Sequence, residues 1–378
     1  MIIGIDIRVL GNHVKSGIEE YTENLLVHML ALDSTIKFKL FFSSWNSDTP
    51  DYDWLHLPNV ELHKFKIPNK FLFASPHLCN APKIDKLIGG ADIFFSPHFL
   101  LSALSPECKK VMTFHDLSYI RFPEFLSWRR SFWHRVEMRP GWQSKFSDKM
   151  IAVSESTKKD LISLYDIDPA KIEIIHSGIS PAIKRPADEL LSEFKTNNNL
   201  PDEFILFLGT LEPRKNISGL VKAFDLLKQN HKFNKLYLIV VGSRGWLSED
   251  MFKQIESSPF KEQIILKGHI KNEDRAFYYS LASVFVYPSF FEGFGFPPLE
   301  AMACGTPVIV SNSSSLPEVV AKAGLLIDPH SINEIALAIS AVLTDKKLKE
   351  SLISLGLERV QGFTWQKTAE KTLEYILK

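Results

Sequence analysis

Residues 204–216 read Phe204-Ile-Leu-Phe-Leu-Gly-Thr-Leu-Glu-Pro-Arg-Lys-Asn216, and this stretch decides the fold that we predict for the chain. Five apolar residues, typical of a buried strand, lead into a turn with Gly209 and Pro213, and a helical pattern follows. The stretch comes directly after a polar segment at 184–202 that is rich in Asn, Pro and charged residues. A strand–turn–helix pattern that restarts after such a segment indicates a second domain.

Short apolar runs alternate with longer amphipathic segments along the whole chain, which is the pattern of βα units and a parallel sheet. The predicted strands lie at 2–7, 38–42, 60–65, 93–96, 111–114, 150–153, 172–175, 204–208, 236–241, 264–266, 284–287 and 308–310. Helices are predicted at 18–32, 156–164, 218–228 and 332–343. We therefore expect an α/β protein with two doubly wound, Rossmann-like domains at 1–182 and 183–362, facing each other across a cleft. A C-terminal helix at about 363–378 is expected to pack back on the first domain.

The composition is that of a soluble globular protein, which we expect to lie in the cytoplasm. Lys and Arg number 44, as do Asp and Glu, so the balance of charge argues against a nucleic-acid partner. Three scattered cysteines, Cys79, Cys108 and Cys304, form neither a disulfide framework nor a zinc spacing, which favours a reducing compartment. The first residues read as a strand rather than a signal peptide, and no apolar run approaches the ~20 residues of a spanning helix.

The strongest local signal is a strand, a loop and a helix at 284–305, with the sequence Val-Phe-Val-Tyr-Pro-Ser-Phe-Phe-Glu-Gly-Phe-Gly-Phe-Pro-Pro-Leu-Glu-Ala-Met-Ala-Cys-Gly. The helix is expected to begin near Pro298 and to stop at Gly305. Backbone amides near Phe294 and Gly295, together with the start of the helix, could bind a diphosphate.

Two carboxylates belong to the same segment. Glu292 lies in the loop and Glu300 lies one turn into the helix, so both are expected to point into one cleft. Carboxylates accept hydrogen bonds from vicinal hydroxyls, so one could hold a sugar and the other a ribose. The alternative is that Glu292 is an ordinary loop residue and Glu300 an acid favoured in the first turn of a helix.

Two adjacent cations, Arg214 and Lys215, follow the first strand of the predicted second domain. Ligands of open α/β sheets bind at the carboxyl ends of the strands, which is where this pair should lie. Arg can grip two phosphate oxygens and Lys supplies a point charge, so we predict a phosphate site. The alternative is a solvated surface pair.

Three candidate residues lie in the first domain. His115 follows the strand at 111–114 and could hydrogen-bond a donor phosphate or a sugar hydroxyl as it titrates near neutrality. Its neighbour Asp116 is either a catalytic base or the cap of the next segment. Gly17 lies at a helix start, where a phosphate or an acceptor could approach the backbone closely. Its loop lacks Gly-x-Gly-x-x-Gly, which disfavours a nicotinamide dehydrogenase.

In this order the motifs resemble the retaining glycosyltransferases of family 4, which have the GT-B fold of two Rossmann-like domains. The resemblance covers nearly the whole chain, and Glu292 and Glu300 have the family's Glu-x7-Glu spacing. It is carried by Ser16-Gly17-Ile18-x-x-Tyr21, Phe114-His115-Asp116, Ile151-Ala-Val-Ser-Glu155, His176-Ser-Gly-Ile179, Gly209-Thr-Leu-Glu-Pro-Arg-Lys-Asn216 and Leu316-Pro-Glu-Val319.

The resemblance implies a role for each of these residues. Glu292 would hold donor sugar hydroxyls, Glu300 the nucleotide ribose, and His115 the transferred sugar or its phosphate. The departing diphosphate would be stabilised by Arg214, Lys215 and the amides near Phe294 and Gly295. Many members of the family carry an Arg directly after the glycine that corresponds to Gly209, whereas this chain has Thr210 there. Arg214 must therefore supply the second cation of the phosphate site.

The activity implied is the retaining, metal-independent transfer of a hexose, with mannose favoured, in surface polysaccharide or glycolipid synthesis. The partners are a nucleotide-sugar donor, which is a substrate rather than a cofactor, and a glycan or lipid-linked acceptor. No metal site is expected, since neither Asp51-Tyr-Asp53 nor Asp166-Ile-Asp168 has a suitable context. The alternatives left open are a nucleotide-sugar epimerase, a phosphorylase of the same fold and a non-catalytic glycan-binding subunit.

One basic, aromatic stretch departs from the balanced charge of the chain. Between Lys109 and Lys149 nine Lys or Arg stand against four Asp or Glu, a net charge of +5, and Phe and Trp residues interleave. Residues 121–149 could therefore contact the inner face of an anionic membrane peripherally. The alternative is an amphipathic helix with its aromatic residues in the core.

Overall fold

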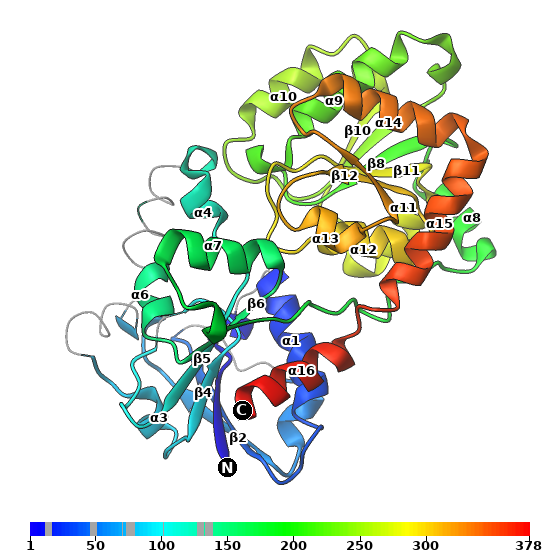
Figure 1. Ribbon diagram of the computed structural model, residues 1–378. Coiled ribbons are helices and arrows are strands. Elements are labelled where there is room, and N and C mark those ends of the chain that lie inside the picture. The colour runs from blue at the N-terminus through cyan, green and yellow to red at the C-terminus, as the bar shows by residue number, and fades with distance from the viewer. Residues whose placement is uncertain are drawn as a thin grey trace. The chain divides into compact units, whose positions relative to one another are not determined.

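The computed structural model describes residues 1–11, 17–45, 51–69, 71–72, 80–100, 102–126, 132 and 139–378 (Figure 1). The chain forms two compact units, one of residues 1–121, 128–178 and 364–378, and one of residues 122–127 and 179–363. It leaves the first unit after Gly178 and returns to it at Thr364, whereas the expected boundary was at 182. The Ile179 amide donates to the Phe363 carbonyl oxygen at 3.1 Å. This hydrogen bond joins the segment that leaves the first unit to the segment that returns to it.

The first unit is built on a parallel sheet of seven strands in the order β3-β2-β1-β4-β5-β6-β7. The strands are β1 (Ile2–Asp6), β2 (Lys37–Ser43), β3 (Val60–Phe65), β4 (Ile93–Ser96), β5 (Lys109–Phe114), β6 (Lys149–Ala152) and β7 (Ile172–Ile174). The helices are α1 (Gly17–Met29), α3 (Ile84–Leu87), α4 (Ser118–Arg121), α6 (Pro140–Lys145), α7 (Glu155–Tyr165) and α16 (Trp365–Leu377).

The C-terminal helix α16 packs against α1 within this unit. The rings of Tyr21 and Trp365 meet edge to face with their centroids 5.6 Å apart, and both side chains are buried. Trp365 also lies against Gly178, where an added Cβ would stand 2.2 Å from the Trp365 nitrogen. Gly178 therefore allows the last segment of the chain to close against the end of the first domain.

The second unit has a parallel sheet of six strands in the order β10-β9-β8-β11-β12-β13. The strands are β8 (Phe204–Leu208), β9 (Tyr237–Val241), β10 (Ile264–Gly268), β11 (Val284–Tyr287), β12 (Val308–Ser311) and β13 (Gly324–Ile327). The helices are α8 (Asp188–Asn197), α9 (Ile217–Lys228), α10 (Glu249–Glu256), α11 (Arg275–Leu281), α12 (Phe296–Ala303), α13 (Leu316–Val320), α14 (Ile332–Thr344) and α15 (Lys346–Val360). Figure 1 shows α9 and α14 on one face of this sheet and α11, α12 and α13 on the other.

The predicted fold class is confirmed, since each unit is a doubly wound parallel sheet and every predicted strand has its counterpart. Several elements were not predicted, among them strand β13 and helix α8. Strand β13 is short and only Ile327 in it is buried, so its apolar pattern is weak. Helix α8 lies inside the polar segment 184–202 and buries only Leu191, which explains why that segment does not look helical.

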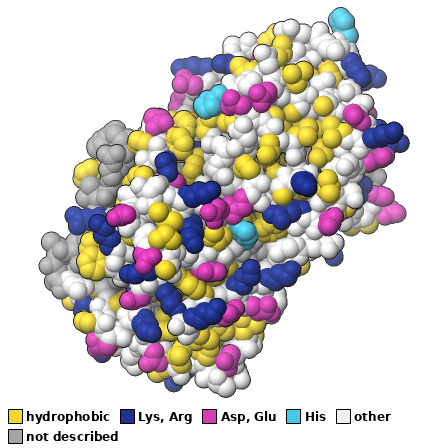
Figure 2. Space-filling view, viewed as in Figure 1, with side chains coloured by type: hydrophobic (Ala, Val, Ile, Leu, Met, Phe, Trp, Pro, Cys, Tyr) yellow, Lys and Arg dark blue, Asp and Glu magenta, His cyan; other side chains and the backbone are white. Residues whose placement is uncertain are grey.

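The exposed surface mixes both signs of charge. On the face that Figure 2 shows, Lys and Arg side chains are interspersed with Asp and Glu side chains over each unit. This agrees with the balanced composition of the chain.

The loops that follow β8 and β9 touch each other at two glycines, which leads to a prediction about stability. A Cβ at Gly242, where φ is +153°, would lie 1.8 Å from the Gly209 carbonyl oxygen. We expect Gly242→Ala to lower the free energy of unfolding by about 3 kcal/mol or more, because the new methyl group would clash with the backbone at Gly209, which would have to shift. Gly268→Ala is the control, since Gly268 also has positive φ but nothing lies within 4 Å of its added Cβ. It should cost about 1 kcal/mol in urea denaturation, and equal losses in the two variants would contradict the account.

Candidate active site

The central feature of the second unit is the point where its strand order reverses. Strands β8 and β11 are neighbours in the sheet, with β9 beyond one and β12 beyond the other. The loops after β8 and β11 therefore leave the sheet at a topological switch point, which is where open α/β sheets bind ligands. The first loop carries Arg214 and Lys215 in a 3₁₀ turn at Pro213–Lys215, and the second carries Glu292.

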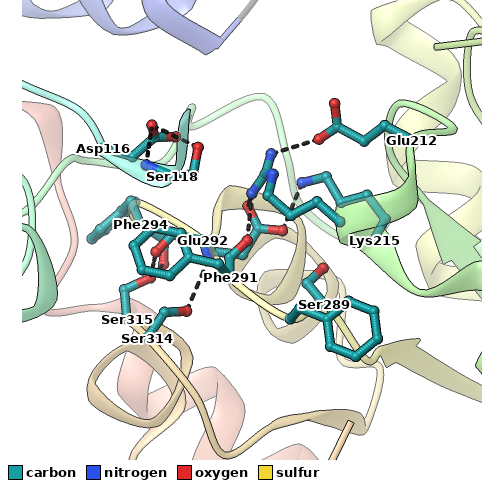
Figure 3. Close-up of polar contacts among 12 residues, drawn as sticks. Asp116, Ser118, Glu212, Lys215, Ser289, Phe291, Glu292, Phe294, Ser314 and Ser315 are labelled. Carbon is teal, nitrogen blue, oxygen red and sulfur yellow. Dashed lines mark hydrogen bonds and ion pairs between the residues drawn. The ribbon is translucent and has the colours of Figure 1, made fainter. Parts of the chain in front are cut away.

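These two loops form one network of charged side chains (Figure 3). Lys215 Nζ donates to Glu292 Oε1 at 2.6 Å, and Arg214 Nη1 donates to Glu292 Oε2 at 2.9 Å. The other arm of Arg214 donates from Nη2 to Glu212 Oε1 at 2.6 Å. Lys215 Nζ also lies 2.6 Å from the Tyr287 hydroxyl oxygen at the end of β11. Two cations are thus held in place by two carboxylates, and three residues that the sequence singled out separately, Arg214, Lys215 and Glu292, lie in direct contact.

The electrostatics of this group keep Glu292 ionised. Burial works to raise the pKa of Glu292, but the charges of Arg214 and Lys215 prevail and lower it to about 2. Burial and the neighbouring Arg214 lower the pKa of Lys215. A carboxylate with so low a pKa accepts hydrogen bonds and does not deliver protons near neutral pH. Glu292 therefore suits the binding of hydroxyl groups rather than general acid catalysis.

A run of serines positions the loop that carries Glu292, and the sequence reasoning did not identify it. The Glu292 amide donates to Ser314 Oγ at 2.8 Å. Ser315 Oγ lies 3.0 Å from the Glu292 carbonyl oxygen and 2.6 Å from that of Phe294, and Ser313 Oγ donates to the Phe290 carbonyl oxygen at 2.8 Å. The signal was the serine-rich turn directly after the predicted strand at 308–310.

The segment expected to form an amide cradle lies at the start of α12. This helix begins at Phe296, before the predicted start near Pro298, and Gly305 follows its end with φ of +75°. Gly295 precedes the helix with φ of +116°, and an added Cβ there would lie 2.9 Å from Leu316 Cδ2. Phe294 and Gly295 directly precede the N-terminal end of the helix, where backbone amides can stabilise an anion. Phosphate binding by these two residues stays a prediction.

The second carboxylate of the Glu-x7-Glu pair has different partners. Glu300 is 2% exposed and pairs with Arg275 of α11, while its Oε2 accepts a hydrogen bond from the Tyr279 hydroxyl at 2.7 Å. Glu292 and Glu300 thus belong to separate clusters, and the binding of a ribose by Glu300 stays a prediction. Arg275 and Tyr279 were not identified from the sequence, because nothing local links α11 to α12.

In the first unit, the expectation that His115 titrates near neutrality is wrong. Burial lowers the pKa of His115 from 6.5 to about 4, and the Tyr21 ring of α1 stands edge-on to it at 4.7 Å. His115 Nε2 lies 2.8 Å from the Pro97 carbonyl oxygen, which can only accept, so the proton is on Nε2. The neutral ring then presents Nδ1 as a hydrogen-bond acceptor.

The structure also describes the other two candidates of the first unit, Asp116 and Gly17. Asp116 Oδ1 accepts from the Ser118 amide at 3.2 Å and from the Ser118 hydroxyl at 3.0 Å, which is the capping role weighed for it. Gly17 is the first residue of α1 and is exposed, and the loop at 12–16 before it lies outside the described residues.

A buried polar cluster that the sequence did not reveal occupies the switch point of the first sheet, between β1 and β4. Arg8 Nη2 donates to Asp6 Oδ2 at 2.6 Å and to Ser102 Oγ at 3.0 Å. His98 Nε2 lies 3.1 Å from the Asp6 carbonyl oxygen. All four side chains are nearly inaccessible to solvent, and the cluster fixes the loops after β1 and β4.

The part of the chain that the structure describes contains neither a cluster of potential metal ligands nor a membrane-spanning helix. Among the described residues, no three His, Cys, Asp or Glu side chains gather as potential metal ligands. In the same part of the chain no helix is long and apolar enough to cross a membrane. Of the basic, aromatic stretch 121–149, residues 127–131 and 133–138 lie outside the described residues.

The low pKa of His115 predicts a pH effect on stability. Between pH 6.5 and about 4 the unfolded chain binds a proton that the folded His115 does not, so the free energy of unfolding falls as the pH drops through this window. We expect His115→Asn to lose this part of the pH dependence. Urea denaturation of both proteins between pH 4.5 and 7.5 measures the difference. Parallel stability curves for wild type and variant would show that His115 is not buried as described.

Known proteins resemble this chain over both units. The model for "Glycosyltransferase Family 4" matches residues 15–183, and the model for "Glycosyl transferases group 1" matches residues 188–359. An O-antigen chain mannosyltransferase B from Escherichia coli is 34% identical over 281 residues, which cover 74% of this chain and 71% of that protein. The serotype-specific mannosyltransferase WbdA from Escherichia coli is 32% identical over 60% of this chain, but only 28% of its own length is matched. A sucrose-phosphate synthase from Thermosynechococcus elongatus has the same fold, with a TM-score of 0.75, 22% identity, and coverage of 99% of this chain and 97% of that one.

Proposed function

This chain belongs to the group 1 glycosyltransferases of family 4, and on that premise we propose that it transfers a hexose from a nucleoside-diphosphate sugar to a glycan or lipid-linked acceptor. Mannose is the favoured hexose, and surface polysaccharide synthesis the favoured setting, because the relative matched over most of its length is an O-antigen mannosyltransferase. The observation that carries the proposal is the Arg214–Lys215–Glu292 group at the switch point of the second sheet.

The proposed chemistry follows from the charge that develops on the leaving group. The bond from the anomeric carbon to the diphosphate oxygen breaks, the bond to an acceptor hydroxyl oxygen forms, and the hydroxyl proton passes to the departing diphosphate. Arg214, Lys215 and the start of α12 would neutralise the diphosphate charge, with Phe294 and Gly295 contributing backbone amides. Fixed positive groups of this kind stabilise a transition state without reorganising during the reaction.

The ion pairs of Glu292 suggest how the donor would bind. Arg214 and Lys215 both donate to Glu292, so an arriving diphosphate would compete for the same donors. As the cations turn toward the phosphates, the oxygens of the ionised Glu292 would become acceptors for the hydroxyls of the sugar. The same carboxylate would thus hold the cations ready before binding and orient the sugar afterwards.

Three finer roles are part of the proposal. Glu300 would bind the ribose, with Arg275 and Tyr279 orienting its carboxylate. Neutral His115 would accept a hydrogen bond from a sugar hydroxyl through Nδ1, and Gly17 would lie close to the donor phosphate. Retention of the anomeric configuration is supported by family membership, and transfer without a metal by the number of positive groups gathered at one site.

Product analysis tests the function. The protein is incubated with the hexose conjugates of GDP, UDP and ADP, with and without a panel of methyl hexopyranosides as acceptors, in EDTA and in Mg²⁺. We expect a glycoside that forms only when an acceptor is present, forms equally in EDTA, and keeps the donor's anomeric configuration by proton NMR. An epimerised nucleotide sugar that forms without any acceptor would contradict the proposal.

Contact with a membrane remains a separate proposal for residues 121–149. Its support is the net charge of +5 between Lys109 and Lys149 together with the interleaved aromatic residues. Co-sedimentation with vesicles that contain anionic lipid, but not with neutral vesicles, is the expected result. Failure to sediment with either would remove the proposal and would leave the proposed reaction untouched.

A further inference from the structure

A cavity of about 240 Å³ opens beside the charged network in the second unit. Its walls combine apolar and polar side chains, among them Phe125, Phe290, Leu247, Met251, Glu212 and Ser218. Among the described residues that line it, none is Lys, Arg or His. A lining with carboxylates and hydroxyls but without a cation fits an uncharged ligand that donates hydrogen bonds, and it does not fit a phosphate.

The aromatic wall of this cavity is firmly held. The rings of Phe125 and Phe290 stack with their centroids 5.5 Å apart and their planes 18° from parallel. Trp246 Nε1 donates to the Phe125 carbonyl oxygen at 2.6 Å, and the Phe122 ring lies 5.6 Å from that of Phe291. The segment 122–126 is thereby fixed against the loop that leads to Glu292, and its ring can serve as part of a binding wall.

Two lining residues have strained backbone. Leu247 has φ of +51° and Asn216 has φ of +54°, a region that non-glycine residues rarely adopt. Leu247 is also 46% exposed, although it is a large apolar side chain. Backbone strain of this kind persists because the surrounding structure maintains it, and it is common at ligand-binding sites.

The cavity adjoins the candidate active site through shared residues. Glu212 lines the cavity and also pairs with Arg214, whose other arm pairs with Glu292. Phe290 also lines the cavity and lies in the same loop as Glu292, and its amide donates to the Arg214 carbonyl oxygen at 2.9 Å. A ligand in the cavity would therefore lie next to the groups proposed to hold the donor sugar.

We propose that this cavity binds a pyranose ring of the acceptor glycan, an inference that rests on the proposed function. The volume is below the about 300–1,000 Å³ of sites for drug-sized ligands, which suits one sugar ring. The apolar C–H groups of the ring would lie against Phe125 and Phe290, and its hydroxyls would donate to Glu212 and to the Ser218 hydroxyl.

Saturation-transfer NMR on the full chain without any nucleotide tests the cavity directly. The probes are methyl α-mannopyranoside, methyl α-glucopyranoside and methyl β-galactopyranoside. Ser218→Phe fills the cavity and Phe125→Ala removes one wall. Phe277→Ala is the matched control, because Phe277 is a half-buried ring stacked on Phe194 at 4.6 Å in the same unit but outside the cavity.

We expect wild type and Phe277→Ala to give a signal with at least one probe, and the two cavity variants to lose it at least fivefold. The thermal shift caused by the nucleotide should be the same in all four proteins. A signal that survives in Ser218→Phe, or a wild-type protein that binds none of the probes, overturns the inference. The inference is also overturned if only the two cavity variants lose the thermal shift caused by the nucleotide, because the cavity would then belong to the donor site. Failure of the proposed function can be told apart from failure of this inference, because the wild-type protein would then show no thermal shift with any nucleotide.

Discussion

Glu292→Ala is expected to lower the turnover number by about a hundredfold or more while leaving the affinity for the nucleoside diphosphate nearly intact. The carboxylate is ionised and would orient the sugar, so its loss removes contacts to the reacting group rather than to the diphosphate. Arg214 and Lys215 remain, and they no longer have Glu292 as a competing acceptor. Steady-state kinetics with a nucleotide hexose, and titration calorimetry with the diphosphate alone, measure the two effects.

Glu292→Gln is the matched control for this variant, because it keeps the shape and removes the charge. Circular dichroism must show both variants folded, since removal of a buried acid leaves two cations less compensated. Equal losses of turnover and of nucleotide affinity would show that Glu292 acts chiefly by holding the cations. The sugar-binding role would then be wrong.

Lys215→Ala should lower kcat/KM by about two to three orders of magnitude and should also weaken binding of the diphosphate. Lys215 is buried, and its Nζ is held by Glu292 and by the Tyr287 hydroxyl at the end of β11. It would supply a fixed positive charge where the leaving group gains negative charge. The loss of affinity for the diphosphate is what separates this variant from Glu292→Ala.

Tyr287→Phe provides the control for the lysine. It removes only the hydroxyl oxygen that accepts from Lys215 Nζ and keeps the buried ring. We expect a change of no more than about tenfold, because the ion pair with Glu292 still positions the lysine. If Lys215→Ala retained both its turnover and its nucleotide affinity, the phosphate site would have to be sought elsewhere.

The strands and their ends could be predicted from the sequence, because the apolar runs at 204–208 and 284–287 are short and bounded by turn residues. This alone places Arg214, Lys215 and Glu292 at strand ends. Their meeting could not be predicted locally, because it depends on β8 and β11 being neighbours in the sheet. Strand order is a property of the whole domain, and β9 and β10 lie between these two strands in the sequence.

The error about the titration of His115 has a similar physical origin. His115 was expected to titrate near neutrality because its surroundings were unknown, and Tyr21 of α1, far away in the sequence, helps to bury it. The partners of Glu300, which are Arg275 and Tyr279 of α11, could not be predicted for the same reason. The spacing of two residues on a chain does not say which helix will pack against each of them.

The most direct test of the central claim is a thermal-shift screen of the purified protein against GDP, UDP, ADP and their hexose conjugates, with EDTA present throughout. We expect a higher Tm with one nucleotide family, and a shift that is strongly reduced in Lys215→Ala. Saturation at about a hundred times Kd should stabilise the fold by about 2.7 kcal/mol. A wild-type protein whose Tm responds to none of these compounds would contradict the assignment of Arg214, Lys215 and Glu292 as the donor site.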